Sequence, residues 1–476
     1  MRKTKISTNM LLNVCKTLLN IVFPIITFPY ISRVLGVEAL GKYQFSTSYI
    51  NYFLMLAGLG ISTYGIREAA KYRNNQNEME IFVSEVFTIN IVSALVAYIA
   101  LILIAQIAVL KNYREIIYIL SIEIAFTTIG VAWLCNVFED FFYITVRHFI
   151  IHILLLVCTL SLVKNESDVY MYAFLVTLAN SGSGLINFFY IRKHYCKFRL
   201  AFNGNLKKHL KPILIIFSTT IAVTIYVSSD TTMLGLMVDD YEVGLYSAAV
   251  KIYTIIKTLL AAILVVLIPR FSSLYAAEDD QKANALLKKV IDIMVPVILP
   301  ASVGLACLSK EIIAFVSGVS FSEGSLALTI LSGAIFFSLF ASMLVNCVLI
   351  PRKQEKIVFF ATAVSAVVNI ALNFILIPLG RRNATAFTTF ISEIITFVIV
   401  FNEAKKVAEI SYEKKDLFIS CLGSFLIVII CVFGRQIVGG AYRLIVLVPL
   451  SVFSYGIIIM MSDTQLSQEI KKRLPH

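Results

Sequence analysis

Long apolar runs constrain this chain more than any other feature of its sequence. A helix needs about 20 predominantly apolar residues to cross a membrane, and runs of that length recur from one end of the chain to the other. Only 15% of the residues are charged, against about 25% in an ordinary soluble domain. One water-soluble core could not bury this much apolar surface, so the sequence predicts an all-α polytopic membrane protein.

Polar breaks between the apolar runs predict about fourteen membrane-spanning helices. Most of the 41 lysine and arginine residues fall at helix ends that share one side when the N-terminus is placed inside. Basic loops stay in the cytoplasm, so a multi-pass protein with both termini cytoplasmic is predicted. The predicted spans are 10–32, 43–66, 82–108, 115–137, 141–163, 169–191, 212–236, 244–268, 290–316, 325–350, 355–378, 384–402, 417–434 and 441–461.

The sequence also contains a faint internal repeat. Two predicted outside turns, "RVLGVEALGKYQ" and "TMLGLMVDDYEVGLYS", each carry Leu-Gly, a short polar turn and then Gly-x-Tyr opening a helix. Gly41 corresponds to Gly244 and Arg67 to Arg270, at one constant offset. An even number of spans per copy makes this a parallel repeat, with halves related by an axis along the membrane normal.

The longest polar segment, 192–211, separates the two copies and is interpreted as a linker between lobes. We therefore expect two six-helix lobes followed by a C-terminal helix pair. The predicted boundaries are 1–200 for the N-lobe, 201–405 for the C-lobe, and 406–476 for the helix pair and a cytoplasmic tail.

Polar residues recur at helical spacing on the first, second, seventh and eighth predicted helices. Steps of three and four residues place them on one face of each helix. Corresponding helices of the two copies share this property, which predicts one hydrated cavity that binds substrate. The residues predicted to line it are Asn13, Lys16, Asn20, Gln44, Ser48, Asn51, Thr224, Lys251 and Lys257.

Three of these residues are lysines inside predicted spans. An unpaired charge at mid-bilayer costs about 2.5–3.5 kcal/mol on insertion scales. Lys257 is about 20 Å along the helix from Gly244, which is too deep for its ammonium to reach water easily. Lys251 and Lys16 lie nearer to helix ends and can extend toward water. The alternative is an internal ion pair, with Asp230 neutralising a lysine.

Acidic residues also occur inside the predicted spans. Asp230, Glu123 and Glu393 are candidates for binding a coupling cation, and their partners cannot be identified from the sequence. Glu85 and Asp292 fall near inner helix ends, where we expect them to face water or a loop.

The sequence lacks the motifs that common enzyme activities need. The sequence has no phosphate-binding loop, and neither its five histidines nor its eight cysteines have metal-ligand spacing. No predicted external loop could hold a catalytic domain, which also disfavours a membrane polymerase or ligase. We expect no enzyme activity, no cofactor and no metal. The net charge of +12 is explained by inner loops, so nucleic acid is not expected as a partner.

Four motifs resemble known segments of one family. "FPYISRVLGVEALGKYQFSTSYINYF" at 28–53 is similar to the start of Wzx-type polysaccharide repeat-unit flippases, which export O-antigen and capsule units. "GIREAAKYRN" at 65–74, "WLCNVFED" at 133–140 and "SSDTTMLGLMVDDYEVGLYSAAVKI" at 228–252 resemble later family segments. The same superfamily holds the MATE drug exporters and the lipid II flippases.

The resemblance implies a V-shaped, two-lobe fold in the bacterial cytoplasmic membrane. It also implies that an undecaprenyl-pyrophosphate-linked oligosaccharide moves from the inner to the outer leaflet by alternating access, coupled to a cation gradient. Membrane lipid, and the polymerase and chain-length regulator of the same pathway, are the implied partners. A lipid II flippase and a MATE-like small-molecule exporter remain the alternatives.

Overall fold

Helices dominate the computed structural model, which describes residues 6–202, 205–265 and 267–473. Within these ranges the chain forms no strand, so the predicted all-α fold is confirmed. The chain divides into two compact units, Met1–Gly244 and Leu245–His476. The predicted lobe boundaries after residues 200 and 405 remain predictions.

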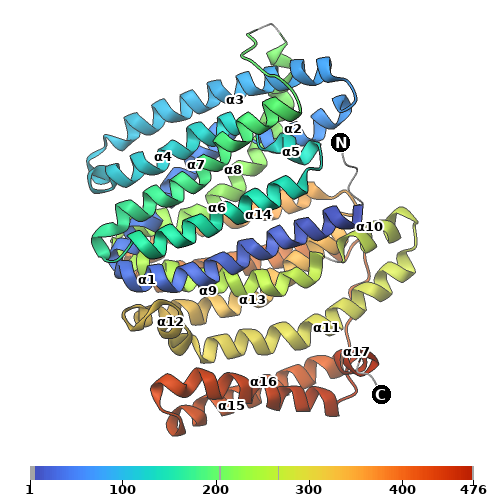
Figure 1. Ribbon diagram of the computed structural model, residues 1–476. Helices are drawn as coiled ribbons and strands as arrows, with labels where there is room; N and C mark the ends of the chain where they lie inside the picture. The colour runs from blue at the N-terminus through green and yellow to red at the C-terminus, as the bar shows by residue number, and fades with distance from the viewer. Residues whose placement is uncertain (1–5, 203–204, 266, 474–476) are drawn as a thin grey trace. The chain divides into compact units, whose positions relative to one another are not determined.

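The first unit is a bundle of long helices joined by short turns. Figure 1 shows α3, α4 and α7 lying side by side, with their axes close to parallel or antiparallel. The helices of this unit are α1 (Ile6–Gly58), α2 (Ile61–Ala69), α3 (Gln76–Ala105), α4 (Arg114–Gly130), α5 (Trp133–Val137), α6 (Phe141–Leu162), α7 (Val169–His194) and α8 (Leu206–Met237).

The second unit has the same construction. Its helices α13 and α14 pack closely, and α15 packs against both α11 and α16. The helices are α9 (Asp240–Val265), which begins at the end of the first unit, α10 (Ile268–Ala276), α11 (Asp280–Cys307), α12 (Ser309–Ser317), α13 (Ser325–Leu344), α14 (Glu355–Ala404), α15 (Lys414–Ile437), α16 (Arg443–Met461) and α17 (Gln465–Arg473).

Each predicted span overlaps a helix, but several spans run past a helix end or across a break between helices. Eleven helical segments of the described chain are long and apolar enough to cross a membrane. Helix α14 contains two predicted spans, and α1 contains the first predicted span and most of the second. The two helices bend at Arg381 and Gly36, where the backbone leaves helical geometry. Helix α4 has 17 residues, so it is just too short to be counted with the eleven.

Gly36 explains why the first pair of spans forms one bent helix. Its φ of 72° lies in the region that glycine adopts without steric cost. At the corresponding turn of the second copy, α8 ends and α9 begins, and the Asp239 carboxylate accepts a hydrogen bond from the Glu242 amide at 2.8 Å. The predicted outside turns therefore exist, built differently in the two copies.

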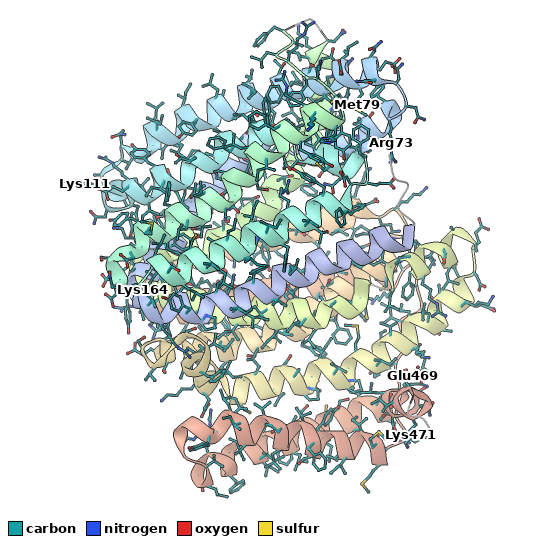
Figure 2. The ribbon with its side chains drawn as sticks, viewed as in Figure 1. Arg73, Met79, Lys111, Lys164, Glu469 and Lys471 are labelled. Carbon is teal, nitrogen blue, oxygen red and sulfur yellow. The ribbon has the colours of Figure 1, made fainter. Side chains whose placement is uncertain are left out.

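Basic residues that the predicted topology places on opposite sides of the membrane lie at opposite ends of the first unit. Figure 2 shows Arg73 and Met79 at one end of the helices, and Lys111 and Lys164 at the other. The sequence predicts Arg73 inside and both lysines outside. The arrangement agrees with that separation, while the side of the membrane that each end faces remains a prediction.

Two glycines of the repeat make a reciprocal contact inside the first unit. A Cβ atom on Gly41 would overlap the carbonyl oxygen of Asp240, and one on Gly244 would overlap that of Val37, both closer than the 3.0 Å that real Cβ atoms keep. Val37 and Asp240 are themselves equivalent in the repeat, at the same offset as the glycines. The two copies of the turn thus cross backbone to backbone, and only glycine leaves room.

The predicted linker lies against helix α3. The backbone amides of Lys197, Arg199 and Ala201 donate hydrogen bonds to side-chain oxygens of α3, with distances of 3.0, 3.2 and 2.8 Å. The acceptors on α3 are Glu80, Ser84 and Thr88. Polar residues in this part of α3 therefore serve to hold the connecting segment.

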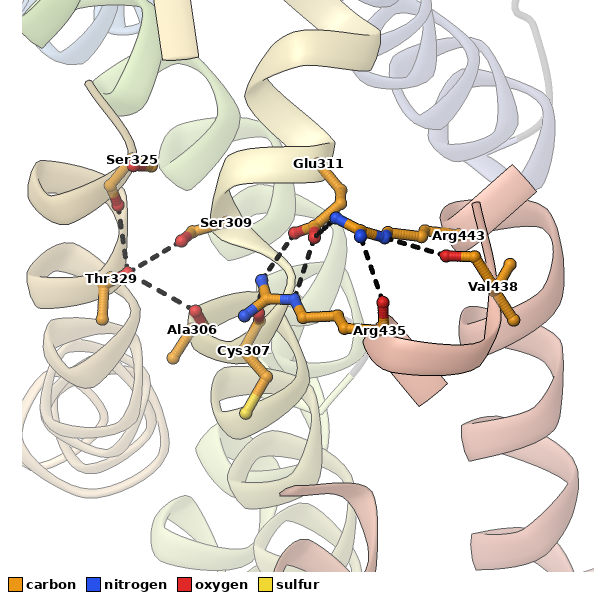
Figure 3. A network of polar contacts seen from close by, with 9 residues as sticks. All are labelled: Ala306, Cys307, Ser309, Glu311, Ser325, Thr329, Arg435, Val438 and Arg443. Carbon is orange, nitrogen blue, oxygen red and sulfur yellow. Dashed lines mark hydrogen bonds and ion pairs between the residues drawn. The ribbon is translucent and has the colours of Figure 1, made fainter. Parts of the chain in front are cut away.

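A cluster of charges fastens the C-terminal helices to the rest of the second unit (Figure 3). Arg435 Nε and Nη2 lie 2.9 and 2.6 Å from the two carboxylate oxygens of Glu311. Arg435 also donates to the Cys307 carbonyl, and Arg443 Nη1 lies 3.5 Å from Glu311. Two-point contact between a guanidinium and a carboxylate is directional as well as strong. Glu311 therefore connects α12 to the turn between α15 and α16.

We expect Glu311→Gln to loosen this connection by about 2 kcal/mol, because two guanidinium groups lose their shared anion. The measurement is the rate at which a thiol reagent labels Cys431, which is 1% exposed in the apolar cluster beside this contact. Glu323→Gln is the matched control, since Glu323 is 64% exposed and lies 3.6 Å from Arg382. Equal labelling rates in the wild type and Glu311→Gln would contradict the expectation.

Candidate functional site

The candidate site centres on Lys257, which occupies the interior of α9. Its ammonium Nζ lies 3.1 Å from Oε1 of Glu393 on α14 and 3.3 Å from the Tyr253 hydroxyl. The Tyr253 hydroxyl donates to the same Glu393 oxygen at 3.2 Å, and the ammonium lies 5.4 Å from the Tyr253 ring centroid. Two side chains of α9 thus converge on one carboxylate oxygen of α14.

Burial makes this cluster unusual. The Glu393 side chain is 8% exposed, while that of Lys257 is 31% exposed. A buried charge is tolerated when a partner and hydrogen bonds compensate for lost water. The pair has no net charge. An ammonium has three N–H donors, and among the described residues two of them have partners, which leaves one face for another ligand. This face is where a negatively charged ligand could approach.

The structure pairs a predicted anion-binding lysine with a predicted cation-coupling acid. The sequence considered an internal ion pair and named Asp230 as the partner for a lysine; for Lys257 the structure places Glu393 there. Asp230 is buried on α8, in the first unit. Whether Lys257 binds cargo and Glu393 a cation remains a prediction.

A layer of buried amides and hydroxyls on α14 was missed by sequence reasoning. Asn373 Nδ2 donates to Asn369 Oδ1 at 3.2 Å, and Thr388 Oγ1 donates to Asn373 Oδ1 at 2.5 Å. The three side chains are at most 1% exposed and join the two arms of α14 on either side of the bend at Arg381. Two asparagines four residues apart in an apolar run were the available signal.

The remaining predicted residue of the second unit is Lys251. It lies half-buried on α9, and among the described residues no ion pair involves it. Helix geometry separates it from Lys257 by about 120° around α9. The two lysines therefore face different directions.

Predicted residues of the first unit fall into three groups. Gln44, Asn51 and Thr224 are half-buried on α1 and α8. Ser48 is buried, and its hydroxyl lies 2.9 Å from that of Thr232 on α8, so it joins these two helices. Asn13, Lys16 and Asn20 belong to α1, but their side chains lie outside the described part of the chain.

Glu123, the third predicted coupling acid, lies at the contact between α4 and α7. Its carboxylate accepts a hydrogen bond from Asn180 Nδ2 at 3.1 Å. No ion pair with Glu123 occurs within the described ranges. Glu123 is half-buried, and its role in cation binding remains a prediction.

Glu85 and Asp292 were expected to face water or a loop; neither faces water, and Asp292 contacts the loop before α15. Glu85 is 0% exposed and Asp292 is 2% exposed. Glu85 contacts His209 and Lys208 at the start of α8, and Asp292 accepts from the Glu413 amide at 2.8 Å. Both lie near helix ends, as predicted, but segments distant in the sequence cover them.

The part of the chain that the structure describes contains no group of three metal-ligating side chains. An apolar cavity of about 400 Å³ lies in the second unit instead, where α11 meets α15 and α16. Pro296, Pro300 and Gly304 line its α11 side, and Val448 and Val452 line its α16 side. The second unit therefore has an ionic cluster and a separate apolar cavity.

Comparison with known proteins identifies similar families and folds. A family model described as polysaccharide biosynthesis protein matches residues 6–275. A putative O-antigen transporter of Escherichia coli strain K12 is 24% identical over 277 residues, which cover 57% of this chain and 65% of that protein. The match thus spans less than two thirds of that relative's length.

Solved structures extend the likeness to nearly the whole chain. The lipid II flippase MurJ in its inward closed conformation superposes with a TM-score of 0.79 at 17% sequence identity, covering 95% of this chain and 98% of that one. A proline-to-alanine variant of a MATE protein gives a TM-score of 0.51 at 13% identity, covering 83% and 94%. These likenesses concern the fold, and they agree with the resemblance carried by the four motifs. The named relatives include a transporter and a flippase, in agreement with a function other than catalysis.

Proposed function

Because the chain belongs to the polysaccharide biosynthesis protein family, we propose that it carries a lipid-linked oligosaccharide across a membrane. The cargo is an undecaprenyl-pyrophosphate-linked repeat unit, moved from the inner to the outer leaflet of the bacterial cytoplasmic membrane. Both termini are cytoplasmic in this proposal, and transport proceeds by alternating access. The similar O-antigen transporter and lipid II flippase support this choice of cargo class.

The observation that carries the proposal is the Lys257–Glu393 ion pair. A pyrophosphate brings two or more negative charges into the bilayer, where an unpaired charge is costly. Lys257 can exchange its carboxylate partner for a phosphate oxygen, provided that Glu393 is neutralised at the same time. Protonation of Glu393 does this with charge balanced, since one proton joins the carboxylate as the cargo anion pairs with the ammonium.

This exchange would make a proton the coupling cation. Glu393 is then the primary coupling acid, with Glu123 and Asp230 as the other candidates. Tyr253 retains a hydrogen bond to Glu393 in either state, because a protonated carboxyl still accepts. The Lys257–Tyr253 contact at 3.3 Å then limits how far the ammonium moves.

Polar residues on α1 and α8 are assigned to the glycan. Sugar hydroxyls both donate and accept hydrogen bonds, so amides and hydroxyls suit them. We assign this role to Gln44, Asn51 and Thr224, which are half-buried, and to Asn13 and Asn20. Lys251 and Lys16 supply further positive charge for the pyrophosphate.

The apolar cavity beside α11 supports a lipid-linked cargo over a soluble one. Its 400 Å³ are lined mostly by aliphatic side chains, which suit hydrocarbon. A small-molecule exporter has no need of such a cavity, whereas a polyprenyl chain must lie against the protein as its headgroup crosses. A lipid II flippase fits the cavity equally well and remains the second candidate.

Deletion of the gene followed by lipid analysis tests the proposal. We expect an undecaprenyl-linked oligosaccharide to accumulate in the inner leaflet and surface polysaccharide to fall, with both restored by the wild-type gene. Accumulation of lipid II would favour the second candidate. An unchanged pool of lipid-linked glycans would refute the proposed cargo class.

A further inference from the structure

The strongest unexplained group in the first unit is a buried chain of three titratable side chains. The Tyr64 hydroxyl of α2 lies 2.6 Å from His209 Nδ1 of α8, and His209 Nε2 lies 2.8 Å from Glu85 Oε2 of α3. Tyr64, His209 and Glu85 are 4%, 3% and 0% exposed. They belong to three helices, and neither the family motifs nor the cargo residues include the histidine or the glutamate.

Hydrogen-bond chemistry fixes the roles of the two ring nitrogens when the carboxylate is ionised. A carboxylate only accepts, so Nε2 carries the hydrogen that points at Glu85. The other nitrogen of a neutral imidazole is then an acceptor, and the Tyr64 hydroxyl donates to it. Lys208 Nζ, 3.1 Å from the same Glu85 oxygen, completes the charge balance.

The Glu85 carboxylate is not fully satisfied. Its second oxygen, Oε1, is buried and has no hydrogen-bond partner among the described residues. An orphaned buried carboxylate oxygen is costly, so such an atom calls for a functional role or a bound ligand to explain it. This is the second, independent indication that the chain of side chains binds something.

The ligand that fits is a proton, since histidine is the side chain that changes charge between about pH 5 and 8. We propose that Tyr64, His209 and Glu85 form a buried proton-binding site that sets how the start of α8 is held. The proton enters from water and joins Nδ1 of His209. The imidazolium then faces Glu85 as a charged pair, and its new N–H points at the Tyr64 oxygen.

Binding of the proton therefore strengthens both attachments of the start of α8. The link from α8 to α3 becomes an ion pair, which strengthens it. The Tyr64 hydroxyl can no longer donate to Nδ1, so it rotates and accepts from the new N–H, and the link from α8 to α2 becomes a charge-assisted hydrogen bond. This site is separate from the Lys257 cluster, and the inference stands whichever cargo the chain carries.

Charged and titratable side chains of three helices lie around the His209 imidazole. On α2, Arg67 and Glu68 act on Tyr64, as does Tyr72 of the next turn. Helix α3 presents Glu85 and α8 presents Lys208. Arg67 is bonded to Glu68 at 3.2 Å, so its charge is partly compensated outside the site.

Trp133 provides a built-in reporter, because it is the only tryptophan of the chain. It lies in the same core cluster as Tyr64. Its ring centroid is 6.4 Å from that of Phe82, which is itself 5.4 Å from the His209 ring. A change in charge or packing at His209 is thus transmitted to the indole through one intervening ring.

The test is the tryptophan emission of the purified full-length chain in lipid nanodiscs between about pH 5 and 8. We expect one titration in the wild type and none in His209→Gln. Glu85→Gln should move the midpoint to lower pH, because the anion that favours the imidazolium is gone. Tyr64→Phe should move it to lower pH by a smaller amount, because the imidazolium N–H loses its acceptor and hydrogen bonds from a charged donor are stronger than neutral ones.

The control is His194→Gln, which alters an exposed histidine of the same unit and should leave the titration unchanged. Tyr64→Phe removes a single hydroxyl, so it keeps the test decisive if the other variants fold poorly. A wild-type emission that does not titrate would overturn the proposal. So would a titration that survives in His209→Gln, or a larger shift in Tyr64→Phe than in Glu85→Gln.

Discussion

Replacement of Lys257 by methionine is expected to abolish export of the lipid-linked cargo. Methionine keeps an unbranched apolar side chain but leaves the Glu393 carboxylate, 8% exposed, without its cation. Removing one partner of a buried ion pair costs about 3–5 kcal/mol. We expect this cost to fall on the conformation that transports cargo, so the population of that conformation should fall by at least about 100-fold. Surface polysaccharide at matched protein level is the measurement.

A second variant separates a transport defect from a folding defect. Lys257→Met combined with Glu393→Gln removes both charges, so no carboxylate remains buried without its partner. This double variant should reach normal protein levels and still fail to export. Lys289→Met, which breaks a more exposed pair with Glu469, should export normally, because such pairs contribute little. Normal polysaccharide in Lys257→Met cells would remove the basis for the proposed pyrophosphate contact.

Substitution of Gly41 by alanine is expected to prevent stable folding. The added Cβ would overlap the backbone of Asp240, and backbone atoms cannot move aside as a flexible side chain can. Overpacking of this kind costs about 3 kcal/mol, a large part of the stability of a typical domain. The yield of monodisperse protein after detergent extraction, and its unfolding temperature, measure the effect.

The repeat supplies a second test of the same contact. Gly244→Ala should be as damaging as Gly41→Ala, because its Cβ would overlap the backbone of Val37. Gly182→Ala is the control, since nothing lies within 4 Å of its added Cβ. Alanine favours helix over glycine, so that control should fold at least as well as the wild type. Wild-type yields for either turn variant would show that the crossing is looser than described.

Much of the fold could be predicted because it depends on local sequence. Apolar runs place the helices, and the recurrence of Gly41 as Gly244 identified the two turns that cross. The merging of spans at Gly36 could not be predicted, since one glycine conformation decides whether a turn ends a helix or bends it. In the second copy the turn separates two helices, α8 and α9, and the Asp239 carboxylate accepts a hydrogen bond at the start of α9.

The sites depended on contacts between residues far apart in the chain. Lys257 was identifiable from its depth, but its partner Glu393 is 136 residues away, and no periodicity connects them. Glu85 looked solvent-facing because it is near a helix end. It is buried because α2 and the start of α8 cover it, and α8 supplies His209, 124 residues distant. The depth of a residue in a predicted helix and its polarity follow from the local sequence. Its partner is known only from the folded structure.

The crossing of the two glycine turns has a consequence for how this chain arose. Residue 37 meets residue 244 while residue 41 meets residue 240, which is the self-complementary pattern of an isologous interface between identical subunits. A half-length ancestor carrying one turn could have paired with a second copy of itself through the same backbone contact. Fusion of the two genes would then have freed each turn to diverge in loop structure and charge. The glycines could not diverge, because each one makes room for the other copy.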